Sequence, residues 1–306
     1  MMAPASESSP ALLTGQRFSR EPLGVSWIHG SVSSKHNTDP DLQVHWYDPH
    51  TVILRQNKAI DYEAPFLFLL FGADRAVLLD TGATEDPAFL PLRRTIDKII
   101  TEWLGRHPRA DYDLLVLHTH AHGDHTAGDH QFADRPGTTL VPADRETAWA
   151  FLGLDAQGAD PVPLDLGQRE LQVLGAAGHD RSALVFYDPW TGFLLTGDTV
   201  YRGRLYVDDW AEYSRTIDRL IAFCADHPVT HVIGCHIEMT REPGVDYPIG
   251  ATFQPEEPPL ELSPDAFTEI RRLLDAPGHV PSRRRAADFI VWPEDGDPTG
   301  YLDPGE

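Results

Sequence analysis

The sequence predicts an α/β protein in which β-sheets pack on one another and helices cover their outer faces. Short β-type runs bounded by turn residues come in groups before and after the helical segments, an order that favours packed sheets. The run from Phe66 to Phe71 is apolar at every position, which is typical of a central strand covered on both faces. We assign residues 21–306 to a single domain, with a flexible arm at residues 1–20 and a C-terminal extension from about residue 243.

The first half of this domain alternates strands with one long helix. Strands are expected at residues 51–55, 66–71, 76–80 and 112–117. A helix is expected at residues 90–105, where Gly105 is placed to end it. Its apolar residues lie at helical spacing: Leu92, Ile96, Ile99, Ile100, Trp103 and Leu104.

The second half repeats the pattern with shorter strands. These are expected at residues 138–141, 170–174, 183–187, 193–195 and 229–233. Helices are expected at residues 208–225 and from Ser263 to about Leu274, where Ser-Pro-Asp opens the helix.

The composition restricts the partners of the protein. Lys and Arg total 25 against 47 Asp and Glu, which gives a formal net charge of −22 and disfavours nucleic acid and anionic membranes as partners. The two cysteines give no disulfide framework, and we find neither a signal peptide nor an apolar run long enough to span a membrane. We therefore expect a cytoplasmic protein that acts on a small molecule; the sequence does not indicate its oligomeric state.

A histidine-rich segment, His118 to His125, follows the expected strand at 112–117 directly. His120 and His122 are two residues apart, so in extended backbone they point to the same side and can bind one ion. Asp124 and His125 lie beyond a glycine, where the chain can turn toward a second ion. Imidazole and carboxylate ligands suit zinc, iron or manganese better than calcium or magnesium. The alternative, an ordinary polar surface loop, does not account for three histidines and an aspartate within six positions.

The pattern H-x-H-x-D-H resembles the signature of the metallo-β-lactamase superfamily. Four further motifs of that family are present, one before this segment and three after it, and all five occur in the family's order. They are Asp80-Thr81-Gly82, Gly178-His179, Gly197-Asp198 and a histidine after a terminal strand, His236.

The resemblance implies a four-layer αββα sandwich with two divalent metal ions at one edge of the sheets. The ions are expected to be Zn²⁺, with iron or manganese as alternatives. The implied ligands are His120, His122 and His179 for the first metal, Asp124, His125 and His236 for the second, and Asp198 as a bridge. A hydroxide between the two ions would be the nucleophile, because two divalent charges lower the pKa of water toward neutrality.

Several neighbouring residues receive other roles. The family spacing leaves His118 outside the ligand set, and the resemblance gives Asp80 the task of orienting nearby loops and histidines. Cys235, before the last histidine, is expected to be a small buried residue rather than a ligand. After His179 the sequence departs from the commoner text of the family, and the side chain of Asp180 is expected to cap that turn.

Asp198 and two tyrosines bear on the substrate. A carboxylate at position 198 resembles the glyoxalase II, lactonase and phosphodiesterase members rather than the true β-lactamases. Tyr201 and Tyr206 follow it, and either phenol is expected to donate a hydrogen bond to the substrate or to pack beneath the site. The candidate catalytic residues are therefore Asp124, Tyr201 and Tyr206.

The leading hypothesis is a binuclear metal-dependent hydrolase of a small ester, thioester or lactone. The first alternative is a phosphodiesterase that uses the same metals. The second is an oxidoreductase with one iron, similar to persulfide dioxygenases, and the third is a metal-free binding protein on the same fold. Residues 29–50 and 236–248 are expected to form walls of the substrate pocket.

Overall fold

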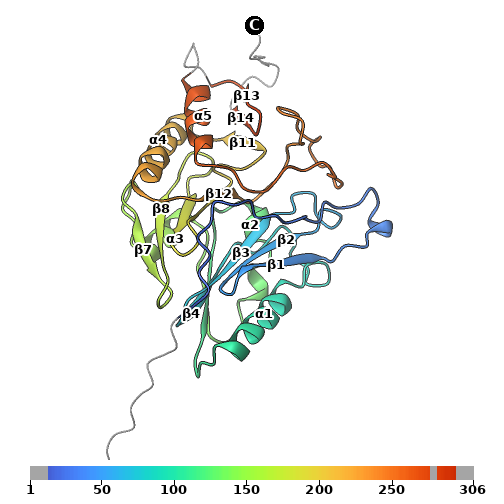
Figure 1. Ribbon diagram of the computed structural model, residues 1–306, viewed down its shortest axis with the longest axis vertical. Coiled ribbons are helices and arrows are strands. Elements are labelled where there is room, and N and C mark those ends of the chain that lie inside the picture. The colour runs from blue at the N-terminus through green and yellow to red at the C-terminus, as the bar shows by residue number, and fades with distance from the viewer. Residues whose placement is uncertain (1–12, 276–280, 294–306) are drawn as a thin grey trace, which may run out of the picture.

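The computed structural model describes residues 13–275 and 281–293, and its largest element is a six-stranded sheet (Figure 1). Its strands follow the chain in the order β1 to β6. They are β1 (Leu42–Asp48), β2 (Thr51–Gln56), β3 (Phe66–Phe71), β4 (Arg75–Leu79), β5 (Asp113–Leu117) and β6 (Thr138–Leu140). The first four strands are antiparallel to their neighbours, whereas β4, β5 and β6 run parallel.

A second sheet contains five strands in the order β12-β10-β9-β8-β7. They are β7 (Val162–Asp165), β8 (Glu170–Gly175), β9 (Leu184–Asp188), β10 (Phe193–Gly197) and β12 (His231–Gly234). In this sheet β10 and β12 run parallel, and the other neighbours are antiparallel.

A third, small sheet has the order β11-β14-β13. Its strands are β11 (Arg204–Val207), β13 (Arg284–Arg285) and β14 (Ile290–Pro293), with β14 parallel to β11. The helices are α1 (Leu92–Arg106), α2 (Gly123–Thr126), α3 (Arg145–Leu152), α4 (Trp210–Asp226) and α5 (Asp265–Leu274).

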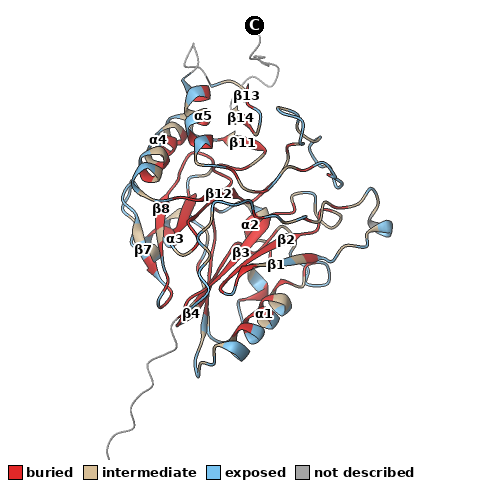
Figure 2. Ribbon diagram, in the orientation of Figure 1, coloured by how far each residue is buried: buried red, intermediate tan, exposed pale blue. Residues whose placement is uncertain are grey.

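Alternating side chains of the central strands build the layers. In β3, Phe66, Phe68 and Leu70 lie in the core between the two large sheets, and the intervening residues pack against α1. In β9, Val185 and Tyr187 instead face the core under α4 and α5. The order is therefore α1, first sheet, second sheet, α4 with α5, and Figure 2 shows the buried strands between helices whose outer sides are exposed. The predicted four-layer αββα sandwich is confirmed.

The predicted elements lie within a few residues of the observed ones, and five strands were not predicted. These are β1, β7, β11, β13 and β14. β1 has partly exposed or exposed residues at its four middle positions from Gln43 to Trp46, and the other four contain only two to four residues each. Such short runs become strands because a neighbouring strand supplies their hydrogen bonds, which local sequence does not reveal.

The described part of the predicted arm, residues 13–20, lies against the domain. The backbone N–H of Leu13 donates to Oε1 of Gln168 at 3.1 Å, and the guanidinium of Arg17 lies 4.4 Å from the ring centre of Tyr47. Residues 1–12 lie outside the described residues. Over the described ranges, no helix has both the length and the apolar character needed to cross a membrane. The cytoplasmic location stays a prediction.

Candidate metal centre

The predicted ligands come from loops and the short helix α2 at one edge of the two large sheets. The segment after β5 carries the histidine-rich motif, and the segments after β10 and β12 carry Asp198 and His236. Because β10 and β12 run parallel, their carboxyl ends lie together. The loop between β8 and β9 adds His179. Residues separated by more than a hundred positions thus meet in one place.

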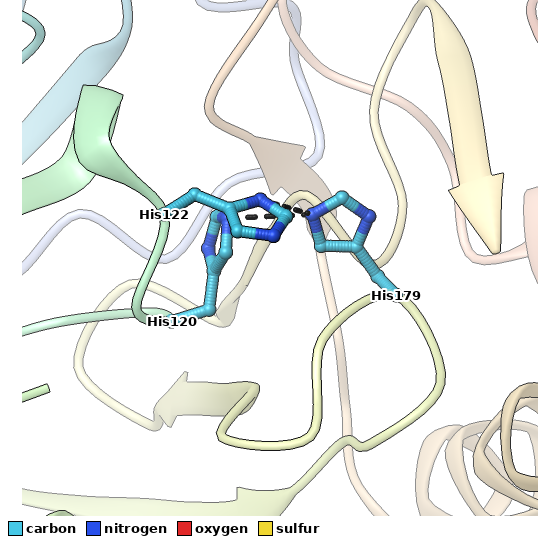
Figure 3. A group of neighbouring side chains, drawn as sticks. All are labelled: His120, His122 and His179. Carbon is cyan, nitrogen blue, oxygen red and sulfur yellow. Dashed lines mark hydrogen bonds between the residues drawn. The ribbon is translucent and has the colours of Figure 1, made fainter. Parts of the chain in front are cut away.

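The first group consists of three imidazole rings (Figure 3). Nε2 of His179 lies 3.3 Å from Nε2 of His120 and 3.2 Å from Nδ1 of His122. Zinc–nitrogen bonds of about 2.0–2.1 Å in a tetrahedral site place neighbouring nitrogens about 3.3 Å apart. The three nitrogens therefore have the spacing that one zinc-sized ion requires.

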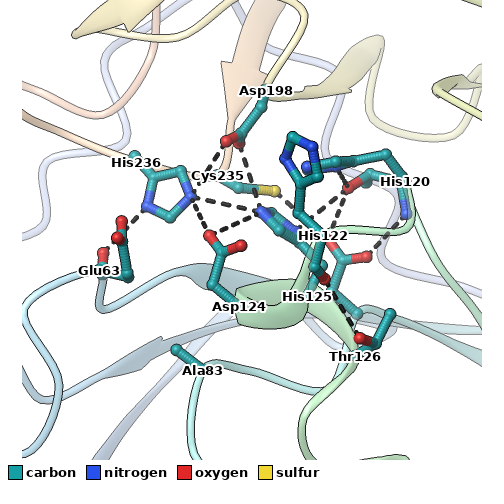
Figure 4. Close-up of polar contacts among 12 residues, drawn as sticks. Glu63, Ala83, His120, His122, Asp124, His125, Thr126, Asp198, Cys235 and His236 are labelled. Atoms are coloured by element: carbon teal, nitrogen blue, oxygen red, sulfur yellow. Dashed lines mark hydrogen bonds and ion pairs between the residues drawn. The ribbon is translucent and has the colours of Figure 1, made fainter. Parts of the chain in front are cut away.

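The second group combines two carboxylates with two imidazoles (Figure 4). Oδ2 of Asp124 lies 3.2 Å from Nε2 of both His125 and His236, and these two nitrogens are 3.4 Å apart. Oδ2 of Asp198 lies 3.3 Å from Nε2 of His236. These donor–donor distances are close to those in the first group, so the four donor atoms also have the spacing that one zinc-sized ion requires.

Asp198 stands between the two groups. Its Oδ2 is 3.3 Å from His236 in the second group and 4.0 Å from Nε2 of His179 in the first. Its Oδ1 is buried and has no hydrogen-bond partner among the described residues. A buried carboxylate oxygen without a donor is costly. A cation bound at this point would remove that cost, so the environment of Asp198 fits the bridging role that the family resemblance implies.

In three of the ligand histidines, Nδ1 is hydrogen-bonded to a group that belongs to neither donor set. Nδ1 of His125 lies 2.9 Å from Oδ2 of Asp80, Nδ1 of His179 lies 2.9 Å from the carbonyl oxygen of Tyr206, and Nδ1 of His236 lies 2.9 Å from the carbonyl oxygen of Glu63. An acceptor at Nδ1 keeps the proton there and leaves Nε2 with the lone pair that a metal binds. The rings are therefore oriented before any ion arrives.

The charged groups of the centre shift one another's pKa values in opposite directions. Burial, together with the neighbouring imidazoles His125 and His179, lowers the pKa of His120 well below its ordinary value. For His236, burial acts in the same direction, but Asp198 and Asp124 outweigh it and raise the pKa well above 6.5. Without an ion, protons therefore compensate the two carboxylates of the second group, of which Asp198 is buried and Asp124 partly buried.

Three residues lie where the sequence predicted, outside the two donor groups. Nε2 of His118 is 2.8 Å from Oδ1 of Asp129, which is not one of the predicted ligands. Asp180 caps its turn by accepting from the backbone N–H of Ser182 at 2.7 Å. Cys235 is fully buried, and its sulfur lies 3.5 Å from a carboxylate oxygen of Asp80.

The two predicted tyrosines differ in their surroundings. Tyr201 is buried, and its hydroxyl donates to the carbonyl oxygen of Arg204 and lies 3.2 Å from Oε2 of Glu238. Tyr206 is half-buried, and burial and nearby Glu238 raise its pKa to about 12, so that it stays protonated. Its ring lies 5.6 Å from that of Trp292 in the neighbouring strand β14.

The donor groups open into a small cavity of about 140 Å³. Its lining residues are Glu63, His122, Asp124, His179, Asp198, Tyr201, Tyr206, His236 and Glu238. The expected wall from residues 236–248 contributes to it, whereas residues 29–50 do not. The loop between β2 and β3 takes their place with Glu63.

Glu63 is a lining residue that the sequence did not reveal, and Glu238 lies within the expected wall at residues 236–248 but was not singled out. Glu63 lies in an irregular loop without a motif, so no local signal marks it. Glu238 is two residues after His236, and in extended backbone that spacing places both side chains on one side. Glu238 forms an ion pair with Arg204, whose Nη1 lies 2.9 Å from Oε1 of Glu238. The guanidinium of Arg204 is therefore engaged by a residue of the cavity wall and is not free to bind a substrate anion.

The fold and the two donor groups define an αββα protein with a candidate binuclear metal centre. The family model described as the metallo-beta-lactamase superfamily matches residues 64–276, which are more than half of the chain. The chain therefore belongs to the metallo-β-lactamase superfamily. A solved metallo-beta-lactamase from Pontibacter korlensis has the same fold, with a TM-score of 0.51 at 17% identity over 77% of this chain and 99% of that chain.

Two curated relatives are similar in sequence over part of their length. The acyl-coenzyme A thioesterase MBLAC2 of Homo sapiens is 28% identical over 185 residues, which are 50% of this chain and 63% of that protein. The hydroxyacylglutathione hydrolase of Rhodobacter capsulatus is 32% identical over 138 residues, which are 42% of this chain and 53% of that protein. The matched part is thus less than two thirds of either relative.

Proposed function

We propose that this protein is a binuclear metal-dependent hydrolase of a small ester, thioester or lactone. The observation that carries the proposal is the position of Asp198, whose carboxylate lies between an all-histidine group and a mixed carboxylate–histidine group. Both groups have their full donor sets, and the second contains Asp124 as well as two histidines. A site for a single ion would not need the second group.

The chemistry follows from the donor sets and the cavity. Two divalent ions held there would activate a water molecule as nucleophile and polarise the carbonyl oxygen of the substrate. The side chains of the protein orient these components: Asp80 fixes His125, and the carbonyl oxygens of Tyr206 and Glu63 fix His179 and His236.

We assign the hydrogen-bond donor for the developing oxyanion to Tyr206. The hydroxyl of Tyr201 already donates to the carbonyl oxygen of Arg204, so its proton is committed within the protein. Tyr206 lines the same cavity, and its phenol stays protonated at neutral pH. A neutral phenol on a residue of the cavity wall is suited to stabilise negative charge as it forms.

The lining of the cavity favours a neutral scissile group over a phosphodiester. No lysine or arginine is among the residues that line it, within the ranges that the structure describes, whereas Glu63 and Glu238 add two carboxylates. Phosphate binding normally recruits arginine or lysine side chains. One relative is named as a thioesterase and the other as a hydrolase of a hydroxyacylglutathione, so thioesters are the first class to test.

The alternative of an oxidoreductase with one iron gives the second donor group no function. Four donor atoms from Asp124, His125, Asp198 and His236 would remain clustered without a cation, three of them on buried residues. Without a cation, this cluster would be balanced only by protons on its imidazoles, whereas a divalent ion would use all four donors, which favours occupancy of both groups.

The test is elemental analysis of the purified protein, followed by assays of the zinc-loaded form. We expect two metal ions per chain and hydrolysis in a panel of acyl thioesters, aryl esters and lactones, with weaker or no turnover of bis-aryl phosphodiesters. One iron per chain, together with oxygen consumption on a persulfide substrate, would replace this proposal with the oxidoreductase. Two ions with turnover of the phosphodiesters alone would overturn the substrate class.

A further inference from the structure

We propose that Lys58, a buried lysine outside both donor groups, positions His236 and thereby sets the affinity of the second metal site. The proposal rests on the binuclear centre described above. It assigns a task to the loop between β2 and β3, in which no motif was recognised in the sequence.

The connection from Lys58 to His236 runs through two consecutive backbone carbonyls. Nζ of Lys58 donates to the carbonyl oxygen of Tyr62 at 2.9 Å. The next carbonyl oxygen, that of Glu63, accepts from Nδ1 of His236 at 2.9 Å. Oδ1 of Asp61 accepts from the backbone N–H of Glu63 at 3.0 Å, and this N–H belongs to the same peptide group as the Tyr62 carbonyl. Lys58 and Asp61 thus hold the Tyr62–Glu63 peptide from both sides, and this peptide directly precedes the Glu63 carbonyl that orients the ligand.

Lys58 is enclosed by chain that is distant in sequence. It is only 2% exposed. Gly30 packs directly on it, because a Cβ atom at Gly30 would lie 2.8 Å from Cβ of Lys58 and 2.0 Å from the carbonyl oxygen of Thr252. The bridge between Gly30 and Phe253 closes this cover. The residue as a whole is thus shielded from solvent by chain that is distant in sequence.

A fully buried ammonium group is expensive to keep. Among the described residues, Nζ of Lys58 makes one hydrogen bond, the one to Tyr62. Glu63, Glu238 and Glu257 lie near enough to act on it electrostatically, but none forms an ion pair with it in the described part of the chain. The directed contact of the lysine is therefore with the loop backbone rather than with a carboxylate.

The effect should be confined to the second site. Nε2 of His236 faces Asp124 and Asp198 only while Nδ1 is held by Glu63, since the two nitrogens belong to one rigid ring. The first group uses other supports: His179 is held by the carbonyl oxygen of Tyr206. None of the residues 57–63 supplies a donor atom to the first group.

A purely structural role for Lys58 makes a different prediction. If the lysine only balances the charge of nearby glutamates or fills space, its removal lowers the stability of the whole protein. Both metal sites would then keep their affinities in the folded variant. The ratio of the two affinities therefore separates positioning from packing.

The experiment compares Lys58→Met with Lys98→Met, a matched change at an exposed lysine of α1. Each protein is stripped of metal and titrated with Zn²⁺ against a chromophoric chelator, and the Co²⁺-loaded forms are recorded by visible absorption. We expect two ions in the unchanged protein and in Lys98→Met. In Lys58→Met the second ion should bind about 10-fold to 100-fold more weakly, with the first unchanged. The absorption of cobalt in the second site should change as well.

If folded Lys58→Met binds zinc at both sites with the same affinities as the unchanged protein, the inference is overturned and the binuclear hydrolase is unaffected. A single ion in the unchanged protein would overturn both. If Lys58→Met does not fold, the pair Asp61→Ala and Asp61→Asn decides, because asparagine keeps the acceptor for the Glu63 N–H and alanine does not. Weakening of the second site in Asp61→Ala but not in Asp61→Asn is expected; no weakening in Asp61→Ala contradicts the proposal.

Discussion

The carboxylate of Asp80 lies against the ring of His125, with Oδ2 of Asp80 2.9 Å from Nδ1 of His125. Its other oxygen accepts from the backbone N–H of Thr119 at 2.7 Å, next to His120. One buried carboxylate from the end of β4 thus supports a ligand of each donor group. Asp80 has φ +68°, a left-handed conformation that aspartate and asparagine adopt more readily than most residues.

Replacement of Asp80 by asparagine should weaken metal binding while preserving the fold. Asparagine tolerates the same backbone conformation. However, only one of its two terminal atoms can accept a hydrogen bond, so it cannot accept from both the Thr119 N–H and Nδ1–H of His125. We expect zinc affinity to fall about 10-fold to 100-fold, measured by chelator competition. The control is Cys235→Ala, which removes a sulfur 3.5 Å from the same carboxylate and should leave both affinities unchanged. Loss of an ion in the control would instead make Cys235 a ligand.

Replacement of Asp198 by alanine should remove the second metal ion and most of the activity. The carboxylate approaches a donor of each group, so the two ions would lose their proposed shared ligand. We expect kcat to fall by roughly 100-fold or more, with close to one ion per chain by elemental analysis. Asp160→Ala, at an exposed position, is the control. Full turnover with two ions in Asp198→Ala would disprove the bridging assignment.

Replacement of the two tyrosines by phenylalanine should separate catalysis from stability. Tyr206→Phe removes the proposed oxyanion donor, so kcat should fall by roughly 100-fold with KM little changed. Tyr201→Phe removes a buried donor to the carbonyl oxygen of Arg204, so unfolding free energy should fall by about 1 kcal/mol with kcat nearly preserved. Steady-state kinetics and urea unfolding check the pair. If Tyr201→Phe loses the turnover and Tyr206→Phe keeps it, the two assignments are reversed.

Stability should rise with pH between about 8 and 10.5 because of Lys58. Burial, with a smaller contribution from Arg55, lowers the pKa of Lys58 to about 8, whereas in the unfolded chain it is 10.5. Between these values the unfolded chain binds more protons than the folded one, so raising the pH stabilises the folded state, by about 3 kcal/mol in total for this group. Urea unfolding of the unchanged protein and of Lys58→Met, from pH 7.5 to 10, isolates the contribution. The same pH dependence in both proteins would show that Lys58 is not its source.

The sequence predicted much of the fold, and particular residues show why. The run Phe66 to Phe71 contains no polar residue, and it became the buried strand β3 with the same boundaries as predicted. The helical spacing of Leu92, Ile96 and Trp103 placed α1 correctly, since all three face one buried side. These features depend on local periodicity, which can be read without knowledge of the partners.

Other features depended on partners far away in the chain. β11 carries Tyr206 and contains only four residues, and it is a strand because β14 pairs with it from residues 290–293. One of the two cavity walls was expected from residues 29–50, but the loop between β2 and β3 supplies it with Glu63. The same early segment instead covers Lys58 through Gly30.

The sequence by itself determined the layered α/β architecture and indicated which side chains belong to the two donor groups. Their spacing within the His118 to His125 segment depends only on local backbone geometry. Only the tertiary structure decided what holds those side chains: Asp80 on His125, and the Glu63 carbonyl on His236 with Lys58 behind it. Hydrogen bonds to a ring nitrogen depend on where distant backbone and side-chain atoms come to rest, and that is fixed by packing rather than by motif.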